Sequence, residues 1–351
     1  MGNVRIFSAI NTKIRVLRGN LLDRKDYISL MEKENTQEQI NYLKENTIYK
    51  EELNSIEDLN DIQKVEIELK YHLISEFEKI MKYFTDEYKK FFRTLMLRHE
   101  IEDLKLYLRA FERKEELSKI ENLRVLKEKY YSFDIRKIKN SSNLEDFIEN
   151  LKGTIYYNAL NPYKDEGQTK IIFYMEMNLD RLYFNQLKFQ SQNLKKEDKL
   201  IFENLLGINE DLLNIEWIYR GIKFYKLLPE ELINFTLPHG YEFNYKKLKE
   251  MCYSNEEKLR KIVLDTDYDF LFDTEKDVDL YMERRIQRYL YYKFLNVFKK
   301  GKLDIDLSIA YIHLLEYEIR DIISILEAKK YQLTLHETKD YLVRKVEGSD
   351  K

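Results

Sequence analysis

Glycine and proline are scarce in this chain, which has nine glycines and three prolines among 351 residues. Average proteins contain about 12% of these two residues together. Both interrupt helices, so their scarcity indicates long helices joined by short loops. Hydrophobic residues make up 44%, enough for sizeable cores, and the length suits two or three domains. The sequence therefore predicts an all-α protein.

Cysteine and long apolar runs are also nearly absent. Cys252 is the only cysteine, so no internal disulfide can form, which suits a reducing compartment. No apolar run approaches the roughly 18 residues that a membrane span requires, and the opening residues lack the apolar core of a signal peptide. We expect a cytoplasmic protein that reaches a membrane only through a partner.

Neither sign of charge dominates the sequence. It has 60 basic and 63 acidic residues and a net charge of −3. Nucleic-acid binders usually carry a basic surplus, because phosphate neutralisation dominates their affinity. This balance argues against a nucleic-acid partner.

Motifs that carry chemistry are missing as well. None of the five histidines has a second histidine four residues away, as a zinc-binding helix needs. There is no nucleophile elbow, glycine-rich phosphate or dinucleotide loop, or CxxC pair. The sequence therefore predicts no catalytic residue, no cofactor and no metal ligand.

One acidic stretch, residues 265–273 (DTDYDFLFD), has a spacing that metal sites use. An EF-hand loop needs Gly at its sixth position and Glu at its twelfth, where this chain has Phe270 and Lys276. A helical enzyme could hold magnesium and a diphosphate on such a cluster. A second, facing cluster would then be expected, whereas Asp277 and Asp279 follow close by. We favour a solvated loop between helices and keep the magnesium site as an alternative.

What the sequence does contain is one ten-residue helical motif, called the phrase below, that occurs three times. EIEDLKLYLR begins at Glu100, DLLNIEWIYR at Asp211 and EIRDIISILE at Glu318, 111 and 107 residues apart. A second set of similar stretches, called the nearer landmark below, lies 34 or 35 residues before each phrase and reads EIELKYHL, EMNLDRLY and ERRIQRYL. A third set, called the farther landmark, lies still further upstream and reads LKENTIY, LKGTIY and LKEMCY. Such repetition predicts three similar helical modules, which we place at residues 1–122, 123–236 and 237–351.

The phrase can be interpreted on a helical wheel of about 100° per residue. Its second, fifth, eighth and ninth residues form an apolar stripe, which we expect to be buried. The acidic first residue lies inside that stripe and the tenth lies opposite, so the acid and the arginine of one copy cannot pair. A carboxylate at the edge of a core needs donors, because an unpaired charge there costs several kcal/mol. Helix amides or an arginine from another element are the expected donors.

The shared pattern of the three copies defines a set of structural residues that we expect to fix how helices dock. They are Glu100, Asp103 and Arg109 in the first copy, Asp211, Asn214 and Arg220 in the second, and Glu318 and Asp321 in the third, where Glu327 replaces the arginine.

These phrases resemble those of the C subunit of V-type and archaeal-type rotary ATPases, which is related to the d subunit of eukaryotic vacuolar ATPases. Further matching stretches are LKGTIYYNAL, NLDRLYFNQL, NIEWIYRGIKFYKLLPEEL and YEIRDIISILEAKKYQL. The similarity spans nearly the whole chain, and its order and spacing are more specific than any single stretch. Glu327 departs from the pattern. A composition rich in Lys, Asn, Ile and Tyr suggests a low-GC bacterium and thus a bacterial V-type complex.

The resemblance implies an all-helical, pseudo-threefold funnel seated on the membrane rotor ring. Such a protein, one copy per complex, joins the ring proteolipid to the central shaft of D- and F-type subunits, which enters the A and B head. The chain would transmit torque between ATP hydrolysis or synthesis and ion transport, without an active site of its own. The alternative is an independent all-helical repeat scaffold that binds a protein or peptide. The choice between protons and sodium ions, and the contact residues, stay open.

Overall fold

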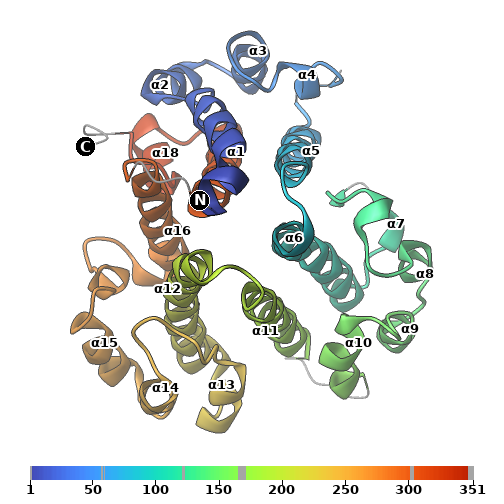
Figure 1. The fold of residues 1–351 in the computed structure, drawn as a ribbon, viewed down its shortest axis with the longest axis vertical. Coiled ribbons are helices and arrows are strands. Elements are labelled where there is room, and N and C mark those ends of the chain that lie inside the picture. The colour runs from blue at the N-terminus through green and yellow to red at the C-terminus, as the bar shows by residue number, and fades with distance from the viewer. Residues whose placement is uncertain are drawn as a thin grey trace. The chain divides into compact units, whose positions relative to one another are not determined.

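The computed structural model of the chain describes residues 2–56, 58, 60–120, 123–164, 171–300 and 304–346. Helices run through these segments and no strand occurs in them (Figure 1), which confirms the all-α prediction. Contacts divide the chain into two compact units. Unit 1 contains Met1–Phe84 and Ser254–Lys351, and unit 2 contains Thr85–Tyr253.

Unit 1 is built around α17 (Asp306–Lys330), which packs against α5, α16 and α1. Most residues of α17 are buried, as expected of a helix at the centre of a core. The other elements of this unit are α1 (Gly2–Gly19), α2 (Arg24–Glu32), α3 (Thr36–Asn46), α4 (Lys50–Leu53), α5 (Ile62–Met81), α15 (Glu256–Leu264), η5 (Asp269–Phe272), α16 (Val278–Val297) and α18 (Leu335–Tyr341).

Unit 2 is built on three long helices, of which α6 (Asp86–Arg113) packs along α11 (Ile171–Ser191), and α11 packs on α12 (Lys196–Arg220). Short helices cover their outer sides (Figure 1). The shorter elements of this unit are α7 (Leu117–Ile120), η2 (Glu128–Tyr130), α8 (Ile135–Lys139), α9 (Leu144–Glu149), α10 (Ile155–Leu160), η3 (Asn161–Tyr163), α13 (Pro229–Phe235) and α14 (Tyr245–Cys252), and η4 (Gly221–Tyr225) continues α12.

Several short helices begin at side-chain caps that the sequence supplies. The side chains of Asp134 and Asn143 accept backbone N–H groups at the starts of α8 and α9. Asn244 and Asn255 do the same for α14 and α15. Each such cap is worth about 1 kcal/mol, so local chemistry fixes where these helices start even though they are too short to be stable alone.

The long helices that carry the repeated phrase also end alike. Lys114, Lys226 and Gln332 adopt positive φ angles of 55°, 51° and 58° after the last turn of each phrase helix. Around them, the N–H of Glu115 bonds the carbonyl of Ala110, and the N–H of Leu333 bonds that of Ala328. Both are left-handed helix terminations, which satisfy carbonyls that the helix leaves free.

The second phrase helix has one extra residue before its termination. The N–H of Leu227 bonds the carbonyl of Gly221, six residues back, where the other two helices bond five residues back. The insertion is absorbed as a π-helical turn, η4. A Cβ at Gly221 would lie 2.3 Å from a methyl group of Leu232, so the Leu232 side chain would have to move if this glycine were replaced.

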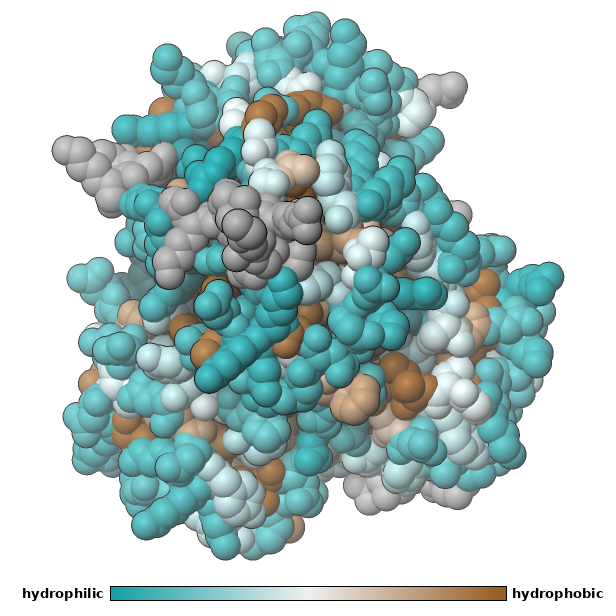
Figure 2. All heavy atoms as spheres, in the orientation of Figure 1, coloured by the Kyte–Doolittle hydropathy of each residue, from teal (hydrophilic) through white to brown (hydrophobic). Residues whose placement is uncertain are grey.

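Hydrophilic residues cover most of the face shown in Figure 2, and hydrophobic residues appear there as small separate spots. No helix among the described residues is both long enough and apolar enough to cross a membrane.

Candidate functional site

The acidic residues of the first phrase bind the chain that follows their own helix. Glu100 Oε1 accepts the backbone N–H of Ser132 at 2.6 Å and its hydroxyl at 2.8 Å. Asp103 accepts the N–H groups of Val125 and Leu126, each at 3.4 Å, and the hydroxyl of Tyr131 at 2.6 Å. Two buried carboxylates of α6 therefore hold the loop at residues 125–132.

The second phrase binds its following loop in a similar way. Asp211 accepts the N–H groups of Glu242 and Phe243 at 2.7 and 3.2 Å. Asn214 makes two hydrogen bonds with Leu237, accepting its N–H and donating to its carbonyl, both at 2.8 Å. The stretch Thr236 to Phe243, which contains a proline and a glycine, is thus a loop held on α12.

The neighbouring acid Glu210 adds a further hydrogen bond to this loop, accepting the N–H of His239 at 2.9 Å. Gly240 lies so close to Asp211 that a Cβ would come within 2.0 Å of Oδ1. On α12, a Cβ at Gly207 would lie 2.9 Å from the N of Tyr241. The close approach of helix and loop therefore depends on two glycines.

The third phrase binds the segment that follows its helix and also two residues of the N-terminal part of the chain. Asp321 accepts the N–H groups of Val343 and Arg344 at 2.6 and 3.0 Å, in the segment that follows its helix. Glu318 instead accepts the N–H of Leu22 at 2.7 Å and the hydroxyl of Tyr49 at 2.7 Å. The N-terminal segment therefore supplies the donors that the following chain supplies to Glu100 and Asp211.

Two further side chains connect these terminal segments. Tyr27 donates from its hydroxyl to Asp321 at 3.2 Å. Arg344 donates to the carbonyl of Leu22 at 2.6 Å, and its guanidinium carbon lies 5.3 Å from the centre of the Tyr27 ring. Residues near both termini thus meet at α17.

Burial is the main cause of unusual acidities at these sites. Removal from water raises the pKa of Glu318 to about 8 and that of Glu210 to about 7. The same cause raises the pKa of Asp103 and of Asp321 to about 6, although the donated hydrogen bonds oppose the shift. A raised carboxyl pKa can mark a catalytic acid, but here these groups bind the protein's own loops.

A second structural element also recurs three times, at a Thr-x-Tyr sequence. The N–H groups of Tyr49, Tyr156 and Tyr268 bond the hydroxyl of the threonine two residues earlier, at 3.3, 3.2 and 3.1 Å. All three tyrosines are buried, with exposures of 0%, 0% and 1%. The third copy of the farther landmark is therefore residues 263–268. The stretch LKEMCY proposed from the sequence is wrong in this respect, since its Tyr253 is 52% exposed.

This finding also accounts for part of the acidic stretch at residues 265–273. Its Thr266 and Tyr268 form the buried turn, and Asp273 accepts the N–H of Glu275 at 2.9 Å. Among the described residues, no group of three or more His, Cys, Asp or Glu side chains is placed to hold a metal ion. The magnesium alternative gains no support from the arrangement.

The arginines of the phrase pair with acids other than the one at its first position. Arg109 donates to both carboxylate oxygens of Glu176 on α11, at 2.6 and 3.2 Å. Arg220 donates to Glu216, one turn earlier on its own helix, at 3.4 Å. Glu327, which replaces the arginine in the third copy, is exposed. Arg109 thus joins two helices, whereas Arg220 pairs within its own helix.

The sequence located the buried acids but not their donors. We expected helix amides or an arginine from another element, and one such arginine is present, since Arg284 of α16 lies 4.0 Å from Asp321 Oδ1. The hydrogen-bond donors are loop N–H groups and the hydroxyls of Ser132, Tyr131, Tyr27 and Tyr49. The Thr-x-Tyr pattern was the available signal for Tyr49. Nothing in the sequence distinguishes Tyr27 from the other 27 of the 28 tyrosines.

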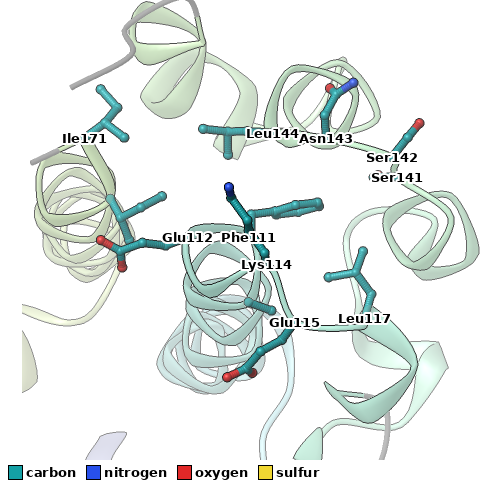
Figure 3. A pocket seen from close by; sticks show the side chains of 12 residues that line it. Phe111, Glu112, Lys114, Glu115, Leu117, Ser141, Ser142, Asn143, Leu144 and Ile171 are labelled. Carbon is teal, nitrogen blue, oxygen red and sulfur yellow. The ribbon is translucent and has the colours of Figure 1, made fainter. Parts of the chain in front are cut away.

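One hollow in unit 2 offers room for a ligand or side chain. A cavity of about 620 Å³ opens where α6 ends. Phe111 from α6, Leu144 from α9 and Ile171 from α11 surround it, and the Lys114 side chain points in among them (Figure 3). Its lining is mainly apolar and includes neither histidine nor cysteine, so it is suited to hydrophobic contact.

Comparison with known proteins identifies the chain's relatives. A profile of the family described as ATP synthase (C/AC39) subunit matches residues 10–341. The C subunit of the A-type ATP synthase of Methanobrevibacter smithii is 24% identical over 91% of this chain and 83% of its own length. Its counterpart from Thermococcus kodakarensis is 23% identical over 90% of this chain and 84% of its own. Both relatives are archaeal, so they lend no support to the bacterial source suggested by composition.

Proposed function

Because the chain belongs to the ATP synthase (C/AC39) subunit family, we propose that it is the non-catalytic adaptor in the rotor of a rotary ATPase. It couples the shaft to the membrane rotor ring and transmits torque between ATP hydrolysis or synthesis and ion transport. The observation that carries this proposal is the family match over residues 10–341, nearly the whole chain.

The proposed partners are the D- and F-type shaft subunits and the ring proteolipid, with one copy of the chain per complex. The chain then lies at the membrane through these subunits. Support comes from the construction of the fold, since a torque-bearing part must resist bending. Long helices paired along their length, such as α6 with α11, meet that demand.

We further propose that the chain forms three similar modules, at residues 1–122, 123–236 and 237–351, in a pseudo-threefold funnel. Support comes from the recurrence of one set of contacts. Each phrase helix holds a loop that starts 22 or 23 residues after the Asp or Asn of the phrase. Under this proposal the first module packs on the third through Leu22 and Tyr49, because Glu318 binds both residues.

The test is to purify the tagged chain from its native membranes in mild detergent and to identify the bound proteins by mass. The proposal predicts recovery of the shaft subunits, the ring proteolipid and the A and B head subunits together. Recovery of the chain alone, or with unrelated soluble proteins, would contradict it and favour an independent helical scaffold.

A further inference from the structure

We propose that an exposed basic surface of unit 2 docks an acidic surface of a neighbouring protein in the complex. The surface, called the basic rim below, consists of Lys127, Lys129, Arg136, Lys137 and Lys139. The partner's class rests on the proposed function, since such a neighbour exists only if the chain works in a complex.

The basic rim is a local concentration of positive charge in a chain that is negative overall. Residues 123–139 contain six basic and two acidic residues, whereas the whole chain has a net charge of −3. Opposite charges on two proteins speed their association and select the correct partner. A local surplus of this kind therefore fits an acidic counterpart.

Four of these five charged residues are exposed to solvent. Lys127, Lys129, Arg136 and Lys137 are exposed and Lys139 is half-buried. The side chain of Arg136 is 78% exposed even though it lies 3.4 Å from Asp134. An ion pair that exposed is weak, because water and salt screen it, so Arg136 can still engage a partner.

The composition of the rim favours a protein over a lipid bilayer. Helices that bind in the interface of a membrane insert large apolar side chains beside their basic residues. The exposed large hydrophobic residues of the described chain include none from residues 123–139. The rim therefore offers charge without an apolar anchor, which suits a complementary protein surface.

The segment that carries Lys127 and Lys129 is attached to α6 on both sides. Asp103 binds the N–H groups of Val125 and Leu126, and Glu100 binds Ser132, on the two sides of η2. The Tyr131 hydroxyl, donated to Asp103, adds a third point of attachment. A loop fixed in this way loses less conformational entropy on binding than a mobile one.

A matched control surface lies at the corresponding place after the second phrase helix. Lys246 and Lys247 occupy the second and third positions after the N-cap of α14, as Arg136 and Lys137 do in α8. Residues 234–250 contain three lysines and two glutamates, so their charge is nearly balanced. Reversing two charges there changes the net charge equally without touching the basic rim.

The experiment compares the wild-type chain with two double variants, Arg136→Glu/Lys137→Glu and Lys246→Glu/Lys247→Glu, each tagged and purified from native membranes. Equal melting temperatures establish that the variants fold. We expect the first variant to recover at least about ten-fold less shaft and ring protein than wild type, the loss that 1.4 kcal/mol of binding free energy produces. The second variant should recover as much as wild type.

Equal recovery by the two variants would overturn the basic rim and leave the adaptor function standing. If the wild-type chain itself recovers no ATPase component, the proposed function fails. The rim is then tested with a polyglutamate peptide and with phosphatidylglycerol vesicles. Peptide binding that only the first variant loses supports the rim, whereas binding to the vesicles alone overturns it in favour of a lipid surface.

Discussion

The hydroxyl of Tyr49 donates a 2.7 Å hydrogen bond to the carboxyl group of Glu318, 269 residues away in the sequence. Both side chains are buried, with exposures of 0% and 4%. This contact joins the N-terminal segment to the central helix α17, so the core of unit 1 requires both parts of the chain.

Loss of this hydrogen bond should destabilise the protein. The substitution Tyr49→Phe removes the donor and leaves a buried acceptor with one partner fewer, at a cost of about 1–3 kcal/mol. Urea unfolding followed by circular dichroism measures the change. Tyr245→Phe is the control, because Tyr245 is 58% exposed, and it should leave stability unchanged. Equal stabilities of the two variants would show that the contact contributes nothing.

The free energy of unfolding should fall as pH rises, because the buried carboxyl group of Glu318 loses its proton. Burial raises its pKa from 4.5 to about 8, so the folded state binds this proton more tightly than the unfolded state. The resulting stabilisation is complete below pH 4.5 and is lost progressively up to pH 8.

The variant Glu318→Gln isolates this effect. Asp103, Asp321 and Glu210 also have raised pKa values, but they contribute to the pH dependence of the unfolding free energy in both proteins. Between about pH 5 and pH 8, wild type should lose a few kcal/mol more of unfolding free energy than the variant, since one pKa unit corresponds to about 1.4 kcal/mol. Parallel pH profiles for the two proteins would rule out a buried carboxyl group at this position that titrates near pH 8.

Asp103 and Asn214 should not be interchangeable, although they occupy the same place in the phrase. Asp103 accepts two consecutive N–H groups, whereas Asn214 pairs with both the N–H and the carbonyl of one residue, Leu237. The change Asp103→Asn turns an NH₂ group toward an N–H donor, and Asn214→Asp turns a carboxylate oxygen toward a carbonyl. Each should cost about 1–3 kcal/mol. Denaturant midpoints equal to that of wild type would contradict the assigned contacts.

Gly240 should tolerate no side chain. A Cβ there would lie 2.0 Å from Asp211 Oδ1, so Gly240→Ala must displace the loop or break the hydrogen bonds of Asp211. We expect a loss of about 1–3 kcal/mol. Gly19→Ala provides the control, since nothing lies within 4 Å of a Cβ at that position. Thermal melts of the two variants that coincide would contradict the close approach.

The helical fold and the family could be predicted because both depend on local or ordered patterns. The scarcity of glycine and proline and the repeated apolar stripe are sufficient to predict the helical fold. The order of the phrases along the chain is sufficient to predict the family. Ile101, Leu104, Tyr107 and Leu108, at the stripe positions of the first phrase, are all buried.

The contacts of the buried acids could not be predicted, because hydrogen bonds to loops leave little trace in a sequence. The groups that bind Asp103 and Asp321 are the backbone N–H groups of Val125 and Leu126 and of Val343 and Arg344, so the side chains of these residues take no part in the bonds. Any residue except proline can donate this bond. The donors of Glu318 lie at the other end of the chain, where the phrase gives no indication of them.

The third farther landmark was misplaced for a related reason. LKEMCY shares amino-acid identities with the first two copies, whereas residues 263–268 share their hydrogen bond between threonine and tyrosine. There Thr266 bonds the N–H of Tyr268, as Thr47 does for Tyr49. Shared hydrogen bonds therefore identify the equivalent positions of the repeats better than similar residues at similar intervals.

The most direct test of the adaptor role measures coupling in membranes. Inverted membrane vesicles from cells that lack this chain are compared with vesicles from cells in which it has been restored. If the chain is the adaptor, vesicles without it should lose ATP-driven ion uptake while the detached head still hydrolyses ATP, and restoring the chain should restore uptake. Unchanged ATP-driven uptake in vesicles that lack the chain would contradict the adaptor role.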